Sequence, residues 1–103
     1  MRQFDIVENL NPLTRGRYPL VVVLQHDRVS TFSVLVVVPL VRSSPALTAT
    51  RLHPSIAVDG RDFVAMVEEL ASVHRRTLGR VFGTAEHRRY EIIRAIDLLF
   101  TGI

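Results

Sequence analysis

Histidine, carboxylate and arginine side chains are the groups in this sequence that could carry out chemistry. The four histidines are His26, His53, His74 and His87. None has another histidine four residues away, as a zinc pair on one helix face requires, and no carboxylate forms a metal-binding motif with them. We therefore expect no metal site and interpret the histidines as surface or turn residues.

Acid-base catalysis leaves no fixed motif, because folding alone can bring a carboxylate, a histidine and an arginine together. His74, followed by Arg75 and Arg76, is the strongest local candidate, and we interpret it as a solvated loop. Gly79 and Gly83 lack the third glycine of a dinucleotide fingerprint, and there is no phosphate-binding glycine loop or Gly-x-Ser-x-Gly motif. We expect no cofactor and no catalytic residues.

The length and composition are typical of one small apolar domain. A chain of 103 residues has the usual size of a single domain, so we expect one domain over residues 1–103. Hydrophobic residues make up 48% of the chain, which leaves apolar surface that self-association would cover. The absence of cysteine excludes disulfides and favours an intracellular protein.

No segment of the sequence directs the chain to a membrane. The first 17 residues carry Asp5 and Glu8 instead of the basic head and apolar run of a signal peptide. The longest apolar runs, residues 20–24 and 34–41, are far shorter than the roughly 20 residues of a membrane helix. We expect a cytoplasmic protein without a membrane partner.

All 13 basic residues are arginines, and the formal net charge is +3. A charge of this size, spread over a whole domain, gives only weak support for direct contact with nucleic acid.

Two apolar segments predict the central pair of antiparallel strands. Residues 18–25 and 32–41 are rich in β-branched residues and flank a polar turn at residues 26–31, and residues 3–7 alternate as an edge or hairpin strand does. The two central strands are apolar at nearly every position, so both faces need a cover. The chain's own helix supplies one, and a second sheet or a partner subunit supplies the other. This is the physical argument for a homodimer.

The second half of the chain predicts a hairpin and a helix. Residues 55–58 and 62–67 are short strands joined by Asp59-Gly60, which suits a tight turn. Residues 68–83 are predicted to be a loop with one short helical turn. A helix is predicted over residues 84–100, capped by Thr84. Its apolar residues recur at three- and four-residue spacing: Tyr90, Ile92, Ile93, Ile96, Leu99 and Phe100.

The C-terminal residues are apolar, whereas helix ends are usually polar and frayed. Two interpretations follow. In the first, Leu99, Phe100 and Ile103 complete the core. In the second, they form an exposed apolar tip that docks on a partner.

The tail AIDLLFTGI resembles that of the CcdB toxins of toxin-antitoxin modules. The resemblance continues, in order along the chain, through these segments: Gln3-Phe4, Arg17-Tyr18 and the apolar strand to Gln25 and Asp27, Val38-Pro39-Leu40, Leu52-x-Pro54, Ala71-Ser72-Val73, and His87-Arg88. Each segment is common by itself, but their order and nearly fixed spacing make the match specific.

The resemblance implies a mainly β fold with a C-terminal helix, an SH3-like barrel of antiparallel strands, paired as a homodimer. It implies a toxin that binds the A subunit of DNA gyrase and traps the cleaved DNA complex. Such a toxin would contact nucleic acid only indirectly. A partly disordered cognate antitoxin would neutralise it. By the same similarity the target-binding residues are Asp97, Phe100, Thr101, Gly102 and Ile103, which would act as a plug and not as catalysts.

One departure from the family concerns Thr101, where the gyrase poisons carry a tryptophan that stacks on an arginine of the target. Loss of such a stack costs about 0.5 to 2 kcal/mol, and truncated hot spots cost about 2 kcal/mol or more, so affinity would fall roughly tenfold to a hundredfold. Two alternatives stay open: a ribonuclease toxin on the same architecture, and a non-toxic relative retained for antitoxin binding or regulation.

Overall fold

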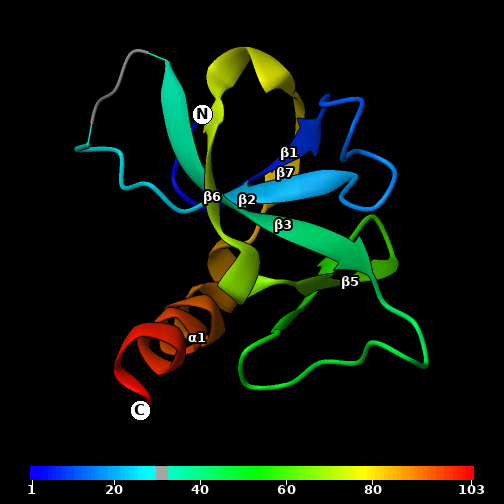
Figure 1. Ribbon diagram of the computed structural model, residues 1–103, viewed down its shortest axis with the longest axis vertical. Coiled ribbons are helices and arrows are strands. Elements are labelled where there is room, and N and C mark those ends of the chain that lie inside the picture. The colour runs from blue at the N-terminus through cyan, green and yellow to red at the C-terminus, as the bar shows by residue number, and fades with distance from the viewer. Residues whose placement is uncertain (30–32) are drawn as a thin grey trace.

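The computed structural model describes residues 1–29 and 33–103 and shows an antiparallel sheet of seven strands with a C-terminal helix (Figure 1). In chain order the strands are β1 (Asp5–Asn9), β2 (Leu20–Val23), β3 (Val34–Arg42), β4 (Ser55–Val58), β5 (Arg61–Ala65), β6 (Ala71–His74) and β7 (Leu78–Thr84), and the helix is α1 (Arg89–Thr101). Three 3-10 turns join the last elements: η1 (Val67–Glu69), η2 (Arg75–Thr77) and η3 (Glu86–Arg88). The predicted mainly β fold with a C-terminal helix is confirmed.

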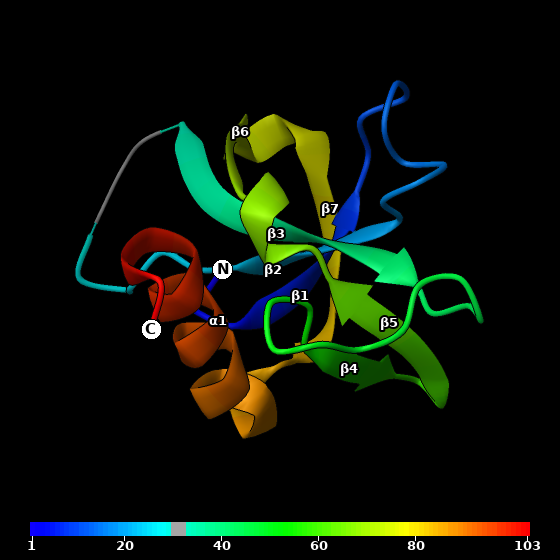
Figure 2. The ribbon, with the colours of Figure 1, turned by 60° about the horizontal axis from the view of Figure 1, so that its bottom comes forward.

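The sheet curls into a half-barrel around β3. Its strands lie in the order β4-β5-β3-β2-β1-β7, and β6 pairs with the first half of β3. Along its nine residues β3 pairs with β6, then with β2 and finally with β5. Because the neighbour changes along the strand, the sheet bends there, and Figures 1 and 2 show β6 rising away from the β4–β5 hairpin.

Alternate residues of β2 and β3 point to opposite faces of the sheet, and both faces are buried. On the first face Leu20, Val22 and Leu40 pack with residues of α1 in the main core. On the second face Val21, Val23 and Val37 form a smaller apolar cluster with residues of β1 and β7. This arrangement explains why the sequence of these strands is apolar at nearly every position.

The chain covers the second face with its own residues. Leu78 of β7 belongs to the smaller cluster, and Val73 of β6 packs against it. The curled sheet therefore acts as the second layer that the apolar strands require. Their apolar sequence does not by itself call for a partner subunit, and the homodimer stays a prediction.

The prediction that β2 and β3 pair as antiparallel strands is confirmed, with Val22 opposite Val38. The predicted turn at residues 26–31 and the predicted strand start at Phe32 fall partly on residues 30–32, which lie outside the described residues. The first strand begins at Asp5 and not at Gln3, because Phe4 has a positive φ of 67° that bends the chain and its side chain is buried in the main core.

The prediction of a loop over residues 68–83 is wrong, because β6 and most of β7 lie within it. Strand β7 is held by pairing with β1, in which Val7 lies opposite Val81. Gly79 looks like a loop residue in the sequence, but here it lies within β7 and leaves room for the side chains of Glu8 and Leu10. A Cβ atom at this position would lie 2.5 Å from the Glu8 Oε1 atom.

The helix begins later than the sequence predicts. Residues 86–88 form η3, and α1 starts at Arg89. The predicted cap at Thr84 is wrong, because Ala85 is the N-cap of η3 and Arg88 that of α1. Thr84 ends β7, and its Oγ1 atom accepts a hydrogen bond of 3.1 Å from the Glu86 N–H in the turn that follows. In the described part of the chain no helix is long and apolar enough to cross a membrane.

The predicted hairpin is confirmed in β4 and β5, which pair in antiparallel fashion with Val58 opposite Arg61. Asp59 and Gly60 have φ values of 51° and 76°. Positive φ at both central residues is typical of the two-residue turn that matches the twist of the strands.

Replacing Gly60 by alanine is expected to lower the free energy of unfolding by about 1 to 2 kcal/mol, because an L-residue is strained at positive φ. A Cβ atom there would meet nothing within 4 Å, so the effect would be purely conformational. Urea denaturation measures it. Gly16→Ala is the matched control, since its Cβ would also stand in open space and no positive φ is found there. Equal stability of the two variants would contradict the prediction.

Candidate functional site

Helix α1 carries apolar side chains on two opposite sides. Ile92 and Ala95 are fully buried, and Ile96 and Leu99 pack against the main core. Tyr90, Ile93 and Phe100 point outward instead, with exposed fractions of 71%, 38% and 69%. In the sequence the buried and the exposed residues form a single apolar pattern, because Ile92 is followed by Ile93 and Leu99 by Phe100. Neighbouring residues point in different directions from a helix, so one residue of each pair faces the core and the other faces solvent.

The last turn of α1 has a defined geometry although it is exposed. Gly102 has a φ of 76° and ends the helix as a left-handed cap, with its N–H bonded to the Leu98 oxygen at 3.0 Å. The Thr101 hydroxyl donates a hydrogen bond of 2.6 Å to the Asp97 main-chain oxygen. The Arg51 Nη2 atom donates one of 2.9 Å to the Ile103 oxygen.

We call the five residues Asp97, Phe100, Thr101, Gly102 and Ile103 the helix tip, and the structure brings them together at one end of the molecule. All five are exposed, and Ile103 is 84% exposed. Figures 1 and 2 show the C-terminus projecting from the body of the fold. The interpretation in which Phe100 and Ile103 complete the core is wrong, and only Leu99 packs there. The role of the helix tip in binding stays a prediction.

Three of the histidines form local contacts. The His26 Nδ1 atom accepts a hydrogen bond of 3.0 Å from the Arg28 N–H, and the His74 Nδ1 atom accepts one of 3.2 Å from the Arg76 N–H. His53 Nε2 lies 2.5 Å from Glu68 Oε2, which ties the segment before β4 to η1. Among the described residues no group of three or more histidine and acidic side chains could hold a metal ion.

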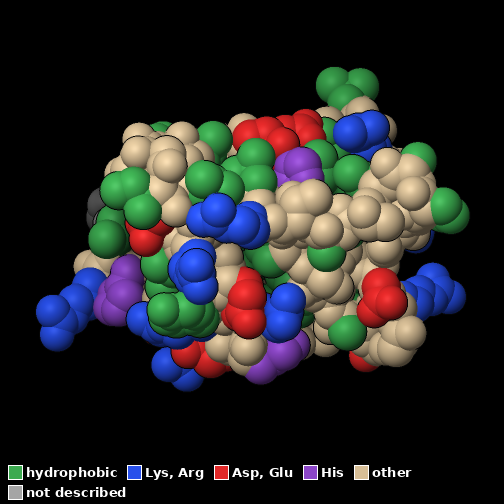
Figure 3. Space-filling model, turned by 90° about the horizontal axis from the view of Figure 1, so that it is seen from below, with side chains coloured by type: hydrophobic (Ala, Val, Ile, Leu, Met, Phe, Trp, Pro, Cys, Tyr) green, Lys and Arg blue, Asp and Glu red, His purple; other side chains and the backbone are tan. Residues whose placement is uncertain are grey.

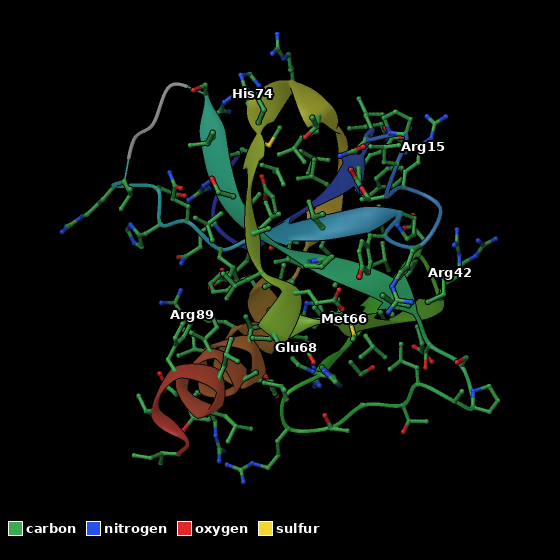
Figure 4. The ribbon with its side chains drawn as sticks, in the orientation of Figure 1. Arg15, Arg42, Met66, Glu68, His74 and Arg89 are labelled. Carbon is green, nitrogen blue, oxygen red and sulfur yellow. The ribbon has the colours of Figure 1, made fainter. Side chains whose placement is uncertain are left out.

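A cavity of about 370 Å³ lies against β2, β3, β6 and β7, and His74, which Figure 4 labels, is among its lining residues. It is lined by His74, Glu69 and Tyr18, whereas Arg75 and Arg76 do not line it. The Tyr18 hydroxyl donates to the Glu69 carboxylate, and this bond, followed by burial, raises the pKa of Tyr18 above its ordinary value. His74 and Arg76 are exposed, as the interpretation of this segment as solvated requires, but His74 ends β6 and the two arginines lie in η2 and not in an irregular loop.

The pairing of Tyr18 with Glu69 joins residues 51 positions apart in the chain. No local pattern in the sequence marks such a pair, so sequence reasoning missed it.

A protein-family model described as CcdB protein matches residues 3–102 of the chain. The match contains every strand, α1 and four of the five residues of the helix tip. Because it covers nearly the whole chain, the protein belongs to the CcdB family, the toxins of toxin-antitoxin modules.

Proposed function

We propose that this protein inhibits DNA gyrase by docking its helix tip on the gyrase A subunit, and that a cognate antitoxin neutralises it. The observation that carries the proposal is the exposure of Phe100 and Ile103 at the end of a helix whose other side is anchored in the core. Because the backbone of α1 is already ordered, the helix presents Phe100 with little backbone ordering on binding. Family membership supports gyrase as the target.

The proposed mechanism is stoichiometric binding and not catalysis. Complete burial of one phenylalanine or isoleucine side chain contributes about 1.5 to 3 kcal/mol. Two such side chains at one end provide a small hot spot of the kind that dominates protein interfaces. In the proposed homodimer each subunit carries a helix tip, so that two tips per molecule can engage the target.

The test combines binding and cleavage assays with purified gyrase. Calorimetry with the gyrase A subunit should show saturable binding, and the whole enzyme with plasmid DNA should accumulate cleaved DNA. If the protein at high micromolar concentration neither binds the subunit nor stabilises cleaved DNA, gyrase is the wrong target. Cleavage of a structured RNA, with or without divalent metal, would favour the ribonuclease alternative.

Two further observations test the partners. Light scattering should give a mass of two chains for the proposed homodimer. A short antitoxin gene beside the gene for this protein would support the proposed module, and harmless overexpression together with tight antitoxin binding would identify a non-toxic relative.

Thr101→Trp is expected to tighten binding to the gyrase A subunit about tenfold, because an indole ring can stack on a cation of the target. The Thr101 side chain is exposed, and its hydroxyl bonds only within the helix to the Asp97 oxygen. Calorimetry gives the Kd, and a growth assay gives the toxicity. Thr101→Ala, which removes the hydroxyl without adding a ring, serves as control and should show no such gain. Equal affinity of Thr101→Trp and the unchanged protein would contradict the gyrase account.

A further inference from the structure

A cavity of about 390 Å³ lies between the start of α1 and residues 49–55, on the end of the molecule seen in Figure 3. Three arginines line it, together with Tyr90 and Glu91: Arg88 is the N-cap of α1, Arg94 lies in that helix, and Arg51 comes from the segment before β4. The three positive charges exceed the one negative charge of Glu91. Figure 3 shows basic side chains gathered around an acidic one on this end.

The fold holds each arginine at the cavity wall by a different contact. The Arg88 Nε atom donates a hydrogen bond of 2.9 Å to the Ser55 main-chain oxygen, and its Nη1 atom lies 3.5 Å from the Glu91 carboxylate. The Arg51 Nη2 atom donates to the Ile103 oxygen. The Arg94 guanidinium lies 5.6 Å from the centre of the Tyr90 ring.

These contacts leave the arginines able to bind an anion. A guanidinium has five N–H donors, and the contacts described above use one or two of them on Arg51 and Arg88. Arg88 is held by the contacts with Ser55 and Glu91 before a ligand arrives, which reduces the entropy lost on binding.

We propose that this cavity binds a nucleotide, with the phosphate group on the arginines and the base against the ring of Tyr90. A guanidinium fork matches phosphate oxygens in geometry. The net positive charge of the cavity wall suits a phosphate monoester, which carries about −1.5 to −2 at pH 7.

The size of the cavity and the presence of Tyr90 point to a nucleotide and not to phosphate alone. Small-molecule sites range over about 300 to 1,000 Å³, and this cavity of about 390 Å³ falls in that range. Tyr90 is 71% exposed. An exposed aromatic ring beside arginines is the arrangement on which nucleic-acid bases stack. The inference does not depend on gyrase as the target, although Arg51 contacts Ile103 of the helix tip.

The test uses nuclear magnetic resonance of the isotope-labelled full chain, titrated with adenosine monophosphate, inorganic phosphate, adenosine and a short single-stranded oligonucleotide. Adenosine monophosphate should shift the signals of residues 49–55 and 88–94 saturably and bind at least threefold more tightly than phosphate or adenosine. Tighter binding of the oligonucleotide would identify a nucleic-acid strand as the source of the nucleotide, and tighter binding of the monophosphate would identify a free nucleotide.

Four variants test whether the nucleotide binds at the residues of this cavity. Arg94→Gln should weaken nucleotide binding at least fivefold, and Tyr90→Ala should remove the preference for the nucleotide over phosphate. Glu91→Gln should tighten binding severalfold, since it removes the carboxylate that competes for Arg88. Arg80→Gln is the matched control, because Arg80 also lies over an aromatic ring, that of Phe82 at 4.5 Å, but outside the cavity.

Three results would overturn the proposal: no saturable shifts, equal affinity for the nucleotide and phosphate, or equal losses in Arg94→Gln and Arg80→Gln. Glu91→Gln is expected to bind the nucleotide more tightly, which poor folding would not produce. This variant therefore tests the proposal even if one of the other variants folds poorly.

Discussion

Replacing Phe100 by alanine is expected to weaken binding to the gyrase A subunit at least thirtyfold while leaving the melting temperature unchanged. The Phe100 side chain is 69% exposed and lies on the outward side of α1, so its removal takes nothing from the core. Truncation of a central aromatic residue at an interface costs about 2 kcal/mol or more, which corresponds to about thirtyfold in Kd. Calorimetry measures the affinity, and a growth assay should show loss of toxicity.

Leu13→Ala is the matched control for Phe100→Ala. Leu13 is 92% exposed, in the segment between β1 and β2, and is not part of the helix tip. We expect no change in affinity or melting temperature. If Phe100→Ala lowered the melting temperature and left the affinity intact, the helix tip would be a structural element and not a binding surface.

The second large effect concerns stability and compares two neighbouring residues. Ile92→Ala should lower the free energy of unfolding by about 2 to 5 kcal/mol, because it leaves a cavity where α1 meets the sheet. Ile92 is 1% exposed and belongs to the main core. In a chain of this size the loss corresponds to a fall of roughly 10 °C or more in melting temperature. Urea denaturation and calorimetry measure both quantities.

Ile93→Ala deletes the same side chain at the next position and is the control. Ile93 is 38% exposed on the outward side of α1, so we expect a loss below about 1 kcal/mol. Equal losses for the two variants would show that the two sides of the helix are not separated as described.

The central part of the fold could be predicted from local sequence patterns. The strands β2 and β3 are marked by β-branched runs, and the β4–β5 hairpin is marked by Asp59-Gly60, whose φ values fit the turn. These features depend on residues close in sequence. Strand β7 was missed because its pairing with β1 joins distant segments, and because Gly79 lies within the strand, where it leaves room for the Glu8 side chain, and not in a turn.

The candidate site could be predicted only in part. Resemblance to a family pointed to the helix tip, but the sequence left open whether Phe100 lies in the core or in solvent. That depends on how the helix is rotated against the sheet, and Ile92 and Ala95 fix this rotation by their burial. The cavity arginines Arg51 and Arg88 were missed because folding, and not spacing, places them together.

The buried side and the exposed side of α1 are under different evolutionary constraints. Substitutions at Ile92 or Leu99 are constrained by packing, whereas substitutions at Ile93, Phe100 or Thr101 leave the scaffold intact. A lineage can therefore exchange one target for another through surface mutations that do not impair folding. Thr101 is exposed on this side, so its replacement would cost the fold little.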